Sequence, residues 1–291
     1  MNITVAENAG FCPGVKRADI TIRRLIENKA ENERIYTLGH LIHNQTYTDF
    51  LSESGVKTIE ADDIERIVTE YPDIMHTVVI RTHGITRELD KMISDLKSKY
   101  GNLKTIDMTC PSVKKIHRIA EDNTSDNTVF LLFCNKDHPE AIGIMSYANG
   151  EKYAFHSAEE IIGIDFSEKI PILCSQTTEN LEEYKKNKKI LKNLCTNAIF
   201  FDTICSVTEI RQEEAISLAK VSDGMIVIGG RNSSNTQKLY KLCKEHCDAA
   251  LCIESPSEIP KDFPIGKNKI GITAGASTPG DIITEVLKLW K

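Results

Sequence analysis

Short apolar runs alternate with longer amphipathic segments along the whole chain. The runs at residues 35–38, 78–80 and 129–133 are rich in β-forming side chains, and each is followed by polar residues and then by a segment of helix length. Strands that alternate with helices in this way are typical of βαβ units. The pattern therefore predicts an α/β protein with mainly parallel sheets.

A cysteine motif recurs three times at nearly equal spacings. Cys12, Cys110 and Cys205 each follow a β-rich stretch and directly precede a predicted helix start. The apolar runs behind each cysteine recur in the same order, which indicates internal repeats. We predict three α/β repeats, at residues 1–106, 107–201 and 202–291, related by pseudo-threefold symmetry around a central pocket.

Polar side chains recur where the predicted strands end, which is where parallel sheets gather functional groups. A lone histidine there is usually only hydrogen-bonded, but equivalent positions in three repeats indicate a common role. Neighbouring glycines would let backbone N–H groups approach a ligand, and helix N-termini attract anions. The chain lacks a P-loop motif and a GxGxxG motif, so a compact phosphate or diphosphate is the expected ligand. The residues of this set are His43, His83, His138, Thr177, Ser233, Ser234, Asn235 and Ser277.

The chain has nine cysteines. A single free cysteine is usually a small buried hydrophobe, and the spacing of Cys243 and Cys247 favours such a buried structural pair. Three cysteines at matching helix N-termini, where a thiolate is stabilised, favour metal ligation instead. Three distant thiolates suit a 4Fe-4S cluster with one open iron, and a catalytic zinc with three cysteines remains the alternative.

Composition narrows the class of protein. A net charge of −6 argues against a nucleic-acid-binding surface. No apolar run is long enough to span a bilayer, and residues 1–7 do not resemble a signal peptide. We expect a cytoplasmic protein that binds neither membrane nor nucleic acid, and in that compartment structural disulfides are not expected.

Glu140 is the carboxylate that lies inside one of the polar motifs, directly after His138 and a proline. Burial beside an anion would raise its pKa, which suits a proton donor. The simpler interpretation is an acidic residue stabilised by the N-terminus of a helix.

Together these motifs resemble a known family over essentially the whole chain. They are GFCPGV, LIHN, THG, TCPSV, HPE, QTT, DTICSVTEIRQ, NSSN and AGAST, in this order. The sequence is similar to the 4-hydroxy-3-methylbut-2-enyl diphosphate reductases, the IspH/LytB family. The resemblance implies the last step of the non-mevalonate isoprenoid pathway, a two-electron reductive dehydroxylation that yields isopentenyl and dimethylallyl diphosphates.

The resemblance also implies roles for the residues. Cys12, Cys110 and Cys205 would ligate one 4Fe-4S cluster, Glu140 would deliver the proton, and the eight polar residues above would bind the allylic diphosphate. Electrons would come from a ferredoxin or flavodoxin, and we expect a monomer or weak dimer. Two alternatives stay open, a hydro-lyase that needs no reductant and a zinc-stabilised phosphate-binding module.

Overall fold

The computed structural model describes residues 2–263 and 265–290. By their internal contacts these residues form two compact units. Unit 1 comprises Met1–Arg17, Ile42–Phe50 and Ser206–Lys291, and unit 2 comprises Ala18–Leu41 and Leu51–Cys205. The helices α1 (Pro13–Glu27) and α2 (Gln45–Glu53) each begin in unit 1 and end in unit 2.

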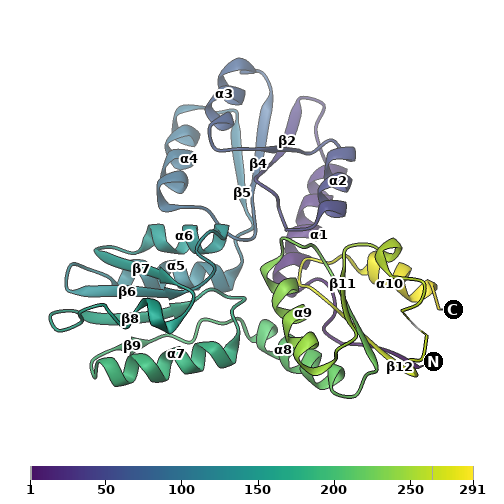
Figure 1. Cartoon of the computed structure of the whole chain (residues 1–291). Coiled ribbons are helices and arrows are strands. Elements are labelled where there is room, and N and C mark those ends of the chain that lie inside the picture. The colour runs from purple at the N-terminus through teal and green to yellow at the C-terminus, as the bar shows by residue number, and fades with distance from the viewer. Residues whose placement is uncertain (1, 264, 291) are drawn as a thin grey trace. The chain divides into compact units, whose positions relative to one another are not determined.

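Unit 2 contains two parallel four-stranded sheets, and the first has the strand order β3-β2-β4-β5. Its strands are β2 (Glu33–Leu38), β3 (Lys57–Ile59), β4 (Met75–Ile80) and β5 (Leu103–Asp107). Buried side chains of α3 (Asp63–Glu70) and α4 (Arg87–Lys99) pack on one face of this sheet (Figure 1). In the register of β4 and β5, Ile80 pairs with Asp107, so both strands end at the same edge.

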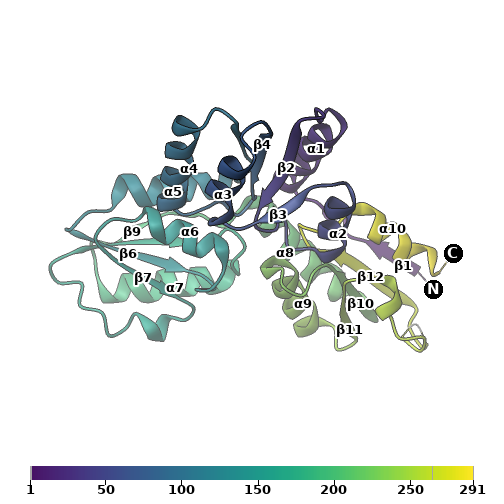
Figure 2. The same cartoon turned by 90° about the horizontal axis from the view of Figure 1, so that it is seen from above.

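The second sheet of unit 2 has the order β7-β6-β8-β9. Its strands are β6 (Thr128–Phe133), β7 (Glu151–Phe155), β8 (Ile170–Ser175) and β9 (Ile199–Phe200). A short 3-10 helix, η1 (Ala158–Glu160), follows β7. The helices α5 (Pro111–Asn123) and α6 (Pro139–Tyr147) cover one face, and α7 (Leu181–Leu194) covers the other (Figure 2). Because both faces are covered, β6 is buried along its whole length and its sequence is almost continuously apolar.

Unit 1 contains one parallel sheet, with the order β1-β12-β10-β11. Its strands are β1 (Asn2–Val5), β10 (Gly224–Ile228), β11 (Ala250–Ile253) and β12 (Lys269–Ala274). The helices α8 (Ser206–Ala219) and α9 (Ser234–His246) pack on one face, and α10 (Gly280–Lys288) packs on the other. The 3-10 helix η2 (Pro256–Glu258) follows β11.

The strand that precedes each site cysteine is an edge strand of one of the three sheets. β5 pairs with β4, β9 pairs with β8, and the N-terminal β1 pairs with β12 near the C-terminus. The predicted class, α/β with parallel sheets, is confirmed. The three-repeat boundaries and the pseudo-threefold arrangement around one pocket stay predictions. Within residues 2–263 and 265–290, no helix is both long and apolar enough to cross a membrane.

The inner strand β6 supplies a test of the packing. Leu131 belongs to β6, is fully buried and packs on the face of the sheet that α7 covers. Leu131→Ala therefore leaves a cavity there. We expect the free energy of unfolding to fall by about 2–5 kcal/mol, as measured by urea denaturation. Ile162→Ala, at a side chain that is 55% exposed, is the control. Equal losses in the two variants would contradict the described core.

Candidate active site

Cys12, Cys110 and Cys205 have the same local backbone setting. Each directly precedes a helix, and its backbone N–H donates a hydrogen bond to a carbonyl just beyond the end of a neighbouring strand. The accepting carbonyls are those of Ala276, Thr82 and Thr177, at 3.2, 3.0 and 3.0 Å. Each of these cysteines thus lies at a helix N-terminus, next to backbone N–H groups that have no partner within the helix.

Further hydrogen bonds reach two of these sulfur atoms. The N–H of Val15 donates to Cys12 Sγ at 3.5 Å, and the Ser112 hydroxyl donates to Cys205 Sγ at 3.7 Å. Since Ser112 lies in the first turn of α5, this bond places the start of the helix that follows Cys110 beside Cys205 in unit 2.

Four of the other cysteines have different surroundings. The three site cysteines are half-buried, whereas Cys134, Cys174, Cys243 and Cys247 are buried. Burial raises the pKa of Cys243 to about 12, which keeps this thiol protonated. The prediction that Cys243 and Cys247 form a buried pair is confirmed, since both lie in the core beside α9. All nine cysteines are free thiols.

Glu140 and Thr177 form a buried polar pair in unit 2. The Glu140 carboxylate is 2% exposed and accepts two hydrogen bonds, at 2.7 Å from the Thr177 N–H and at 2.9 Å from its hydroxyl. Thr177 also provides the carbonyl that receives the Cys205 N–H. One residue therefore links the carboxylate to the cysteine segment.

His138 caps helix α6, and its Nδ1 accepts the N–H of Glu140 at 3.1 Å. An accepting Nδ1 requires the neutral ring to carry its proton on Nε2, which makes Nε2 a donor. The His83 ring meets the His138 ring edge to face, with centroids 5.3 Å apart. Unit 2 thus contains six predicted site residues, namely His83, Cys110, His138, Glu140, Thr177 and Cys205.

The polar residues of unit 1 gather at the carboxyl ends of β10 and β12. Ser233 caps α9 by accepting the Thr236 N–H at 3.3 Å, and Ser234 accepts a hydrogen bond from Lys238 at 3.0 Å. The next residue, Asn235, is 5% exposed, and its Nδ2 has no hydrogen-bond partner among residues 2–263 and 265–290. A buried donor without a partner is costly, and an anion bound there would satisfy it.

Two loops approach this cluster because glycine leaves room for them. A Cβ on Gly230 would lie 2.6 Å from the backbone oxygen of His43, and a Cβ on Gly275 would lie 2.1 Å from Thr236 Oγ1. Gly275 precedes Ser277 by two residues in the same turn. The glycines therefore hold the segments of His43 and Ser277 against the start of α9.

Sequence reasoning missed Ser112 and Thr236. Ser112 was visible as a hydroxyl in the first helical turn after a cysteine, but its partner Cys205 is remote in sequence. Thr236 is fully buried. Its hydroxyl lies where a side chain at position 275 would be, which explains the glycine there. That contact joins helix α9 to the turn after β12, and these two segments are distant in sequence.

This is an α/β protein with three thiols at helix N-termini and a polar cluster suited to an anion. The chain matches the LytB protein family over residues 3–291. It is 39% identical over 289 residues to the 4-hydroxy-3-methylbut-2-enyl diphosphate reductase of Caldanaerobacter subterraneus subsp. tengcongensis, covering 99% of this chain and 96% of that protein.

Two solved structures have the same fold. One is (E)-4-hydroxy-3-methyl-but-2-enyl diphosphate reductase, described as the terminal enzyme of the non-mevalonate pathway, with a TM-score of 0.69 and 33% identity over 99% of this chain and 98% of that one. The other is the E-1-hydroxy-2-methyl-but-2-enyl-4-diphosphate reductase of Plasmodium falciparum, with a TM-score of 0.86 and 25% identity over 99% and 87% of the two chains. The chain belongs to the LytB family of 4-hydroxy-3-methylbut-2-enyl diphosphate reductases, which confirms the predicted family and enzyme class.

The close approach at Gly230 can be tested directly. Gly230→Ala places a methyl group against the His43 carbonyl, so we expect a loss of about 1–3 kcal/mol in stability, measured by thermal unfolding. Gly280→Ala is the matched control, because a Cβ there meets no atom within 4 Å. An unchanged midpoint for Gly230→Ala would show that the turn has more room than its geometry indicates.

Proposed function

We propose that this chain reduces 4-hydroxy-3-methylbut-2-enyl diphosphate, the reaction for which its relatives are named. Two electrons and two protons remove the allylic hydroxyl as water and give isopentenyl and dimethylallyl diphosphates, the last step of the non-mevalonate isoprenoid pathway. The observation that carries the proposal is the identical backbone setting of Cys12, Cys110 and Cys205. Three repeated, half-buried thiols at helix starts suit metal ligation better than packing.

The residues present fit a 4Fe-4S cluster with three cysteine ligands. The chemistry of the donor set agrees, because the thiols lie at helix N-termini and receive N–H or O–H hydrogen bonds at Cys12 and Cys205. Cys12, Cys110 and Cys205 would hold the cluster. When bound, it would supply the two electrons one at a time and an iron site for the substrate oxygen.

The substrate diphosphate would be bound by neutral donors. The Nε2 proton that the His138 tautomer requires and the amide of Asn235 are suited to phosphate oxygens. The N-terminus of α9, which Ser233 caps, adds the positive end of a helix dipole. We propose that the diphosphate contacts are made by His43, His83, His138, Thr177, Ser233, Ser234, Asn235 and Ser277.

Glu140 would deliver the proton. Thr177 donates a hydrogen bond to each of the two Glu140 oxygens, through one N–H and one hydroxyl. These two hydrogen bonds orient a buried carboxyl group, as general acid catalysis requires. The same threonine is a proposed substrate contact, which would bring the proton donor next to the ligand.

The proposal extends to the cellular setting. We infer that a ferredoxin or flavodoxin supplies the electrons, since the substrate brings none. Nine free thiols are compatible with a reducing compartment, and we propose that the protein works in the cytoplasm as a monomer or weak dimer.

The cluster proposal predicts the metal content. Anaerobically purified protein is expected to contain about four iron and four acid-labile sulfide per chain. Cys12→Ser, Cys110→Ser and Cys205→Ser should each lose most of both, and with them the reduction of the allylic diphosphate by a one-electron donor. Iron and sulfide analysis measures the first result, and product analysis measures the second.

Cys195→Ser is the matched control for these variants. Cys195 is also half-buried, and its thiol donates to the Leu191 carbonyl at 3.3 Å, a bond that serine can keep. It should retain iron and activity. Zinc in place of iron, turnover without a reductant, or full iron in any of the three site variants would overturn the proposal.

The role of Glu140 predicts a separation of turnover from binding. In Glu140→Gln the amide can keep both contacts with Thr177, because the threonine hydroxyl can rotate to accept. We expect kcat to fall by about 10²–10⁴-fold with KM little changed, the range typical of lost general acid catalysis. Steady-state kinetics on protein with full iron content measures both parameters. A raised KM with normal kcat would instead make Glu140 a binding residue.

A further inference from the structure

His117 is a buried histidine in unit 2 to which the proposed reaction assigns no role. It lies on α5, two turns after Cys110, and is 7% exposed. Its Nε2 has no hydrogen-bond partner among residues 2–263 and 265–290. Leaving such an atom unpaired lowers stability, so the choice of this side chain calls for an explanation.

One side of the His117 ring lies against the turn that carries His83. A Cβ on Gly84 would be 2.9 Å from His117 Cε1 and 3.1 Å from a methyl carbon of Thr109. Gly84 follows His83 directly and has a φ of 78°, which only glycine adopts readily. Thr109 precedes Cys110. The ring therefore lies against the neighbour of His83, and Thr109 borders the same space.

The other contacts of the ring are with helix α6. The ring stacks on Tyr147 at the end of this helix, with centroids 4.3 Å apart and planes at 16°. A Cβ on Gly143 would lie 3.5 Å from His117 Nε2. His138 and Glu140 are at the start of the same helix. His117 thus lies between the turn of His83 and the helix of His138.

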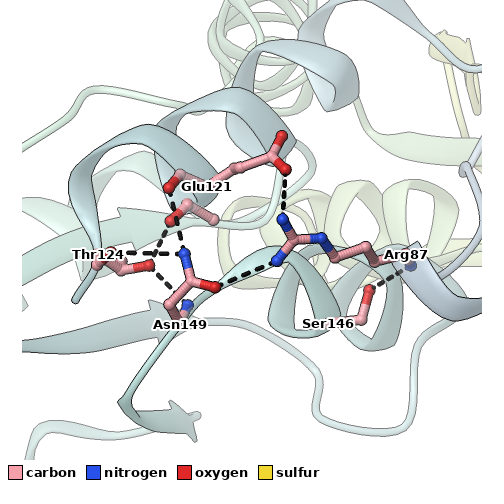
Figure 3. A network of polar contacts seen from close by, with 6 residues as sticks. Arg87, Glu121, Thr124, Ser146 and Asn149 are labelled. Carbon is pink, nitrogen blue, oxygen red and sulfur yellow. Dashed lines mark hydrogen bonds and ion pairs between the residues drawn. The ribbon is translucent and has the colours of Figure 1, made fainter. Parts of the chain in front are cut away.

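An outer polar network crosses the same junction of α4, α5 and α6 (Figure 3). Arg87 pairs with Glu121 at 2.7 Å and donates to the side chain of Asn149 at 3.1 Å, and its backbone N–H donates to Ser146 at 2.9 Å. These contacts are exposed to solvent and contribute little stiffness individually. The ring of His117 belongs to the buried part of this junction.

We propose that His117 is a positioning residue whose flat ring sets the spacing between the turn of His83 and helix α6. This spacing maintains the 5.3 Å edge-to-face contact of the His83 and His138 rings. The inference rests on the proposed function, in which both of these histidines bind the substrate diphosphate. A shift of either imidazole would weaken that binding without removing a ligand group.

The shape of the ring, and not its charge, accounts for this role. Burial lowers the pKa of His117 to about 4, so the ring is neutral near pH 7. Beside it is a cavity of about 190 Å³, lined in part by Asp107, Glu121 and Tyr147. Loss of the imidazole would enlarge this space and allow the turn and α6 to move.

The test is the affinity of the iron-loaded enzyme for inorganic diphosphate, measured by titration calorimetry. His117→Ala is expected to bind it about tenfold more weakly, because small displacements of binding groups have large effects. His117→Phe, which keeps a flat ring and removes the unpaired nitrogen, should restore affinity to within about threefold of the parent. Iron content should be the same in all of these proteins.

His76→Ala is the matched control. His76 is also fully buried in unit 2 and stacks on a tyrosine, Tyr36, but it lies at the amino end of β4. This variant should lower the unfolding temperature and leave diphosphate affinity unchanged. The role of the ring would be overturned if His117→Ala bound diphosphate as tightly as the parent. It would also be overturned if His117→Phe bound diphosphate as weakly as His117→Ala. Failure of the parent itself to bind diphosphate would instead count against the proposed function.

Discussion

One backbone hydrogen bond at each site cysteine fixes its position relative to a neighbouring strand. The strand before each cysteine is an edge strand. The carbonyl that accepts the cysteine N–H lies just beyond the end of the strand that pairs with this edge strand. The bond therefore continues the parallel ladder past the ends of the two strands. The accepting residue is Thr177 itself or directly precedes His83 or Ser277. A single hydrogen bond therefore joins each cysteine to a segment that carries one of the proposed diphosphate contacts.

The polar groups around these rungs make the folded chain less stable than an apolar packing would. Asn235 Nδ2 and Thr236 Oγ1 are buried without hydrogen-bond partners among the described residues, and each such group costs about 1–3 kcal/mol. The three sheets offset this cost, because strands such as β6 are buried on both faces. A stable scaffold with unsatisfied donors at its strand ends is what binding of a small anion requires.

Much of this candidate site could be predicted from the sequence because similar motifs recur along the chain. Cys12, Cys110 and Cys205 stand out through their common spacing, and the strand-end histidines and serines follow from the alternation of strands and helices. Ser112 and His117 could not be found in this way. Their partners, Cys205 for one and Gly84 with Tyr147 for the other, come from segments that are distant in sequence.

The sequence by itself determined the α/β class, the repeated cysteines and the family, because these depend on local periodicity and on motifs that are contiguous in the chain. Only the tertiary structure decided that β1 joins β12, that Thr177 holds both oxygens of Glu140, and that the His83 and His138 rings meet at 5.3 Å. Such contacts depend on how strands exchange between sheets and how helices pack on them. That packing is settled by the summed burial of many side chains, which no single motif encodes.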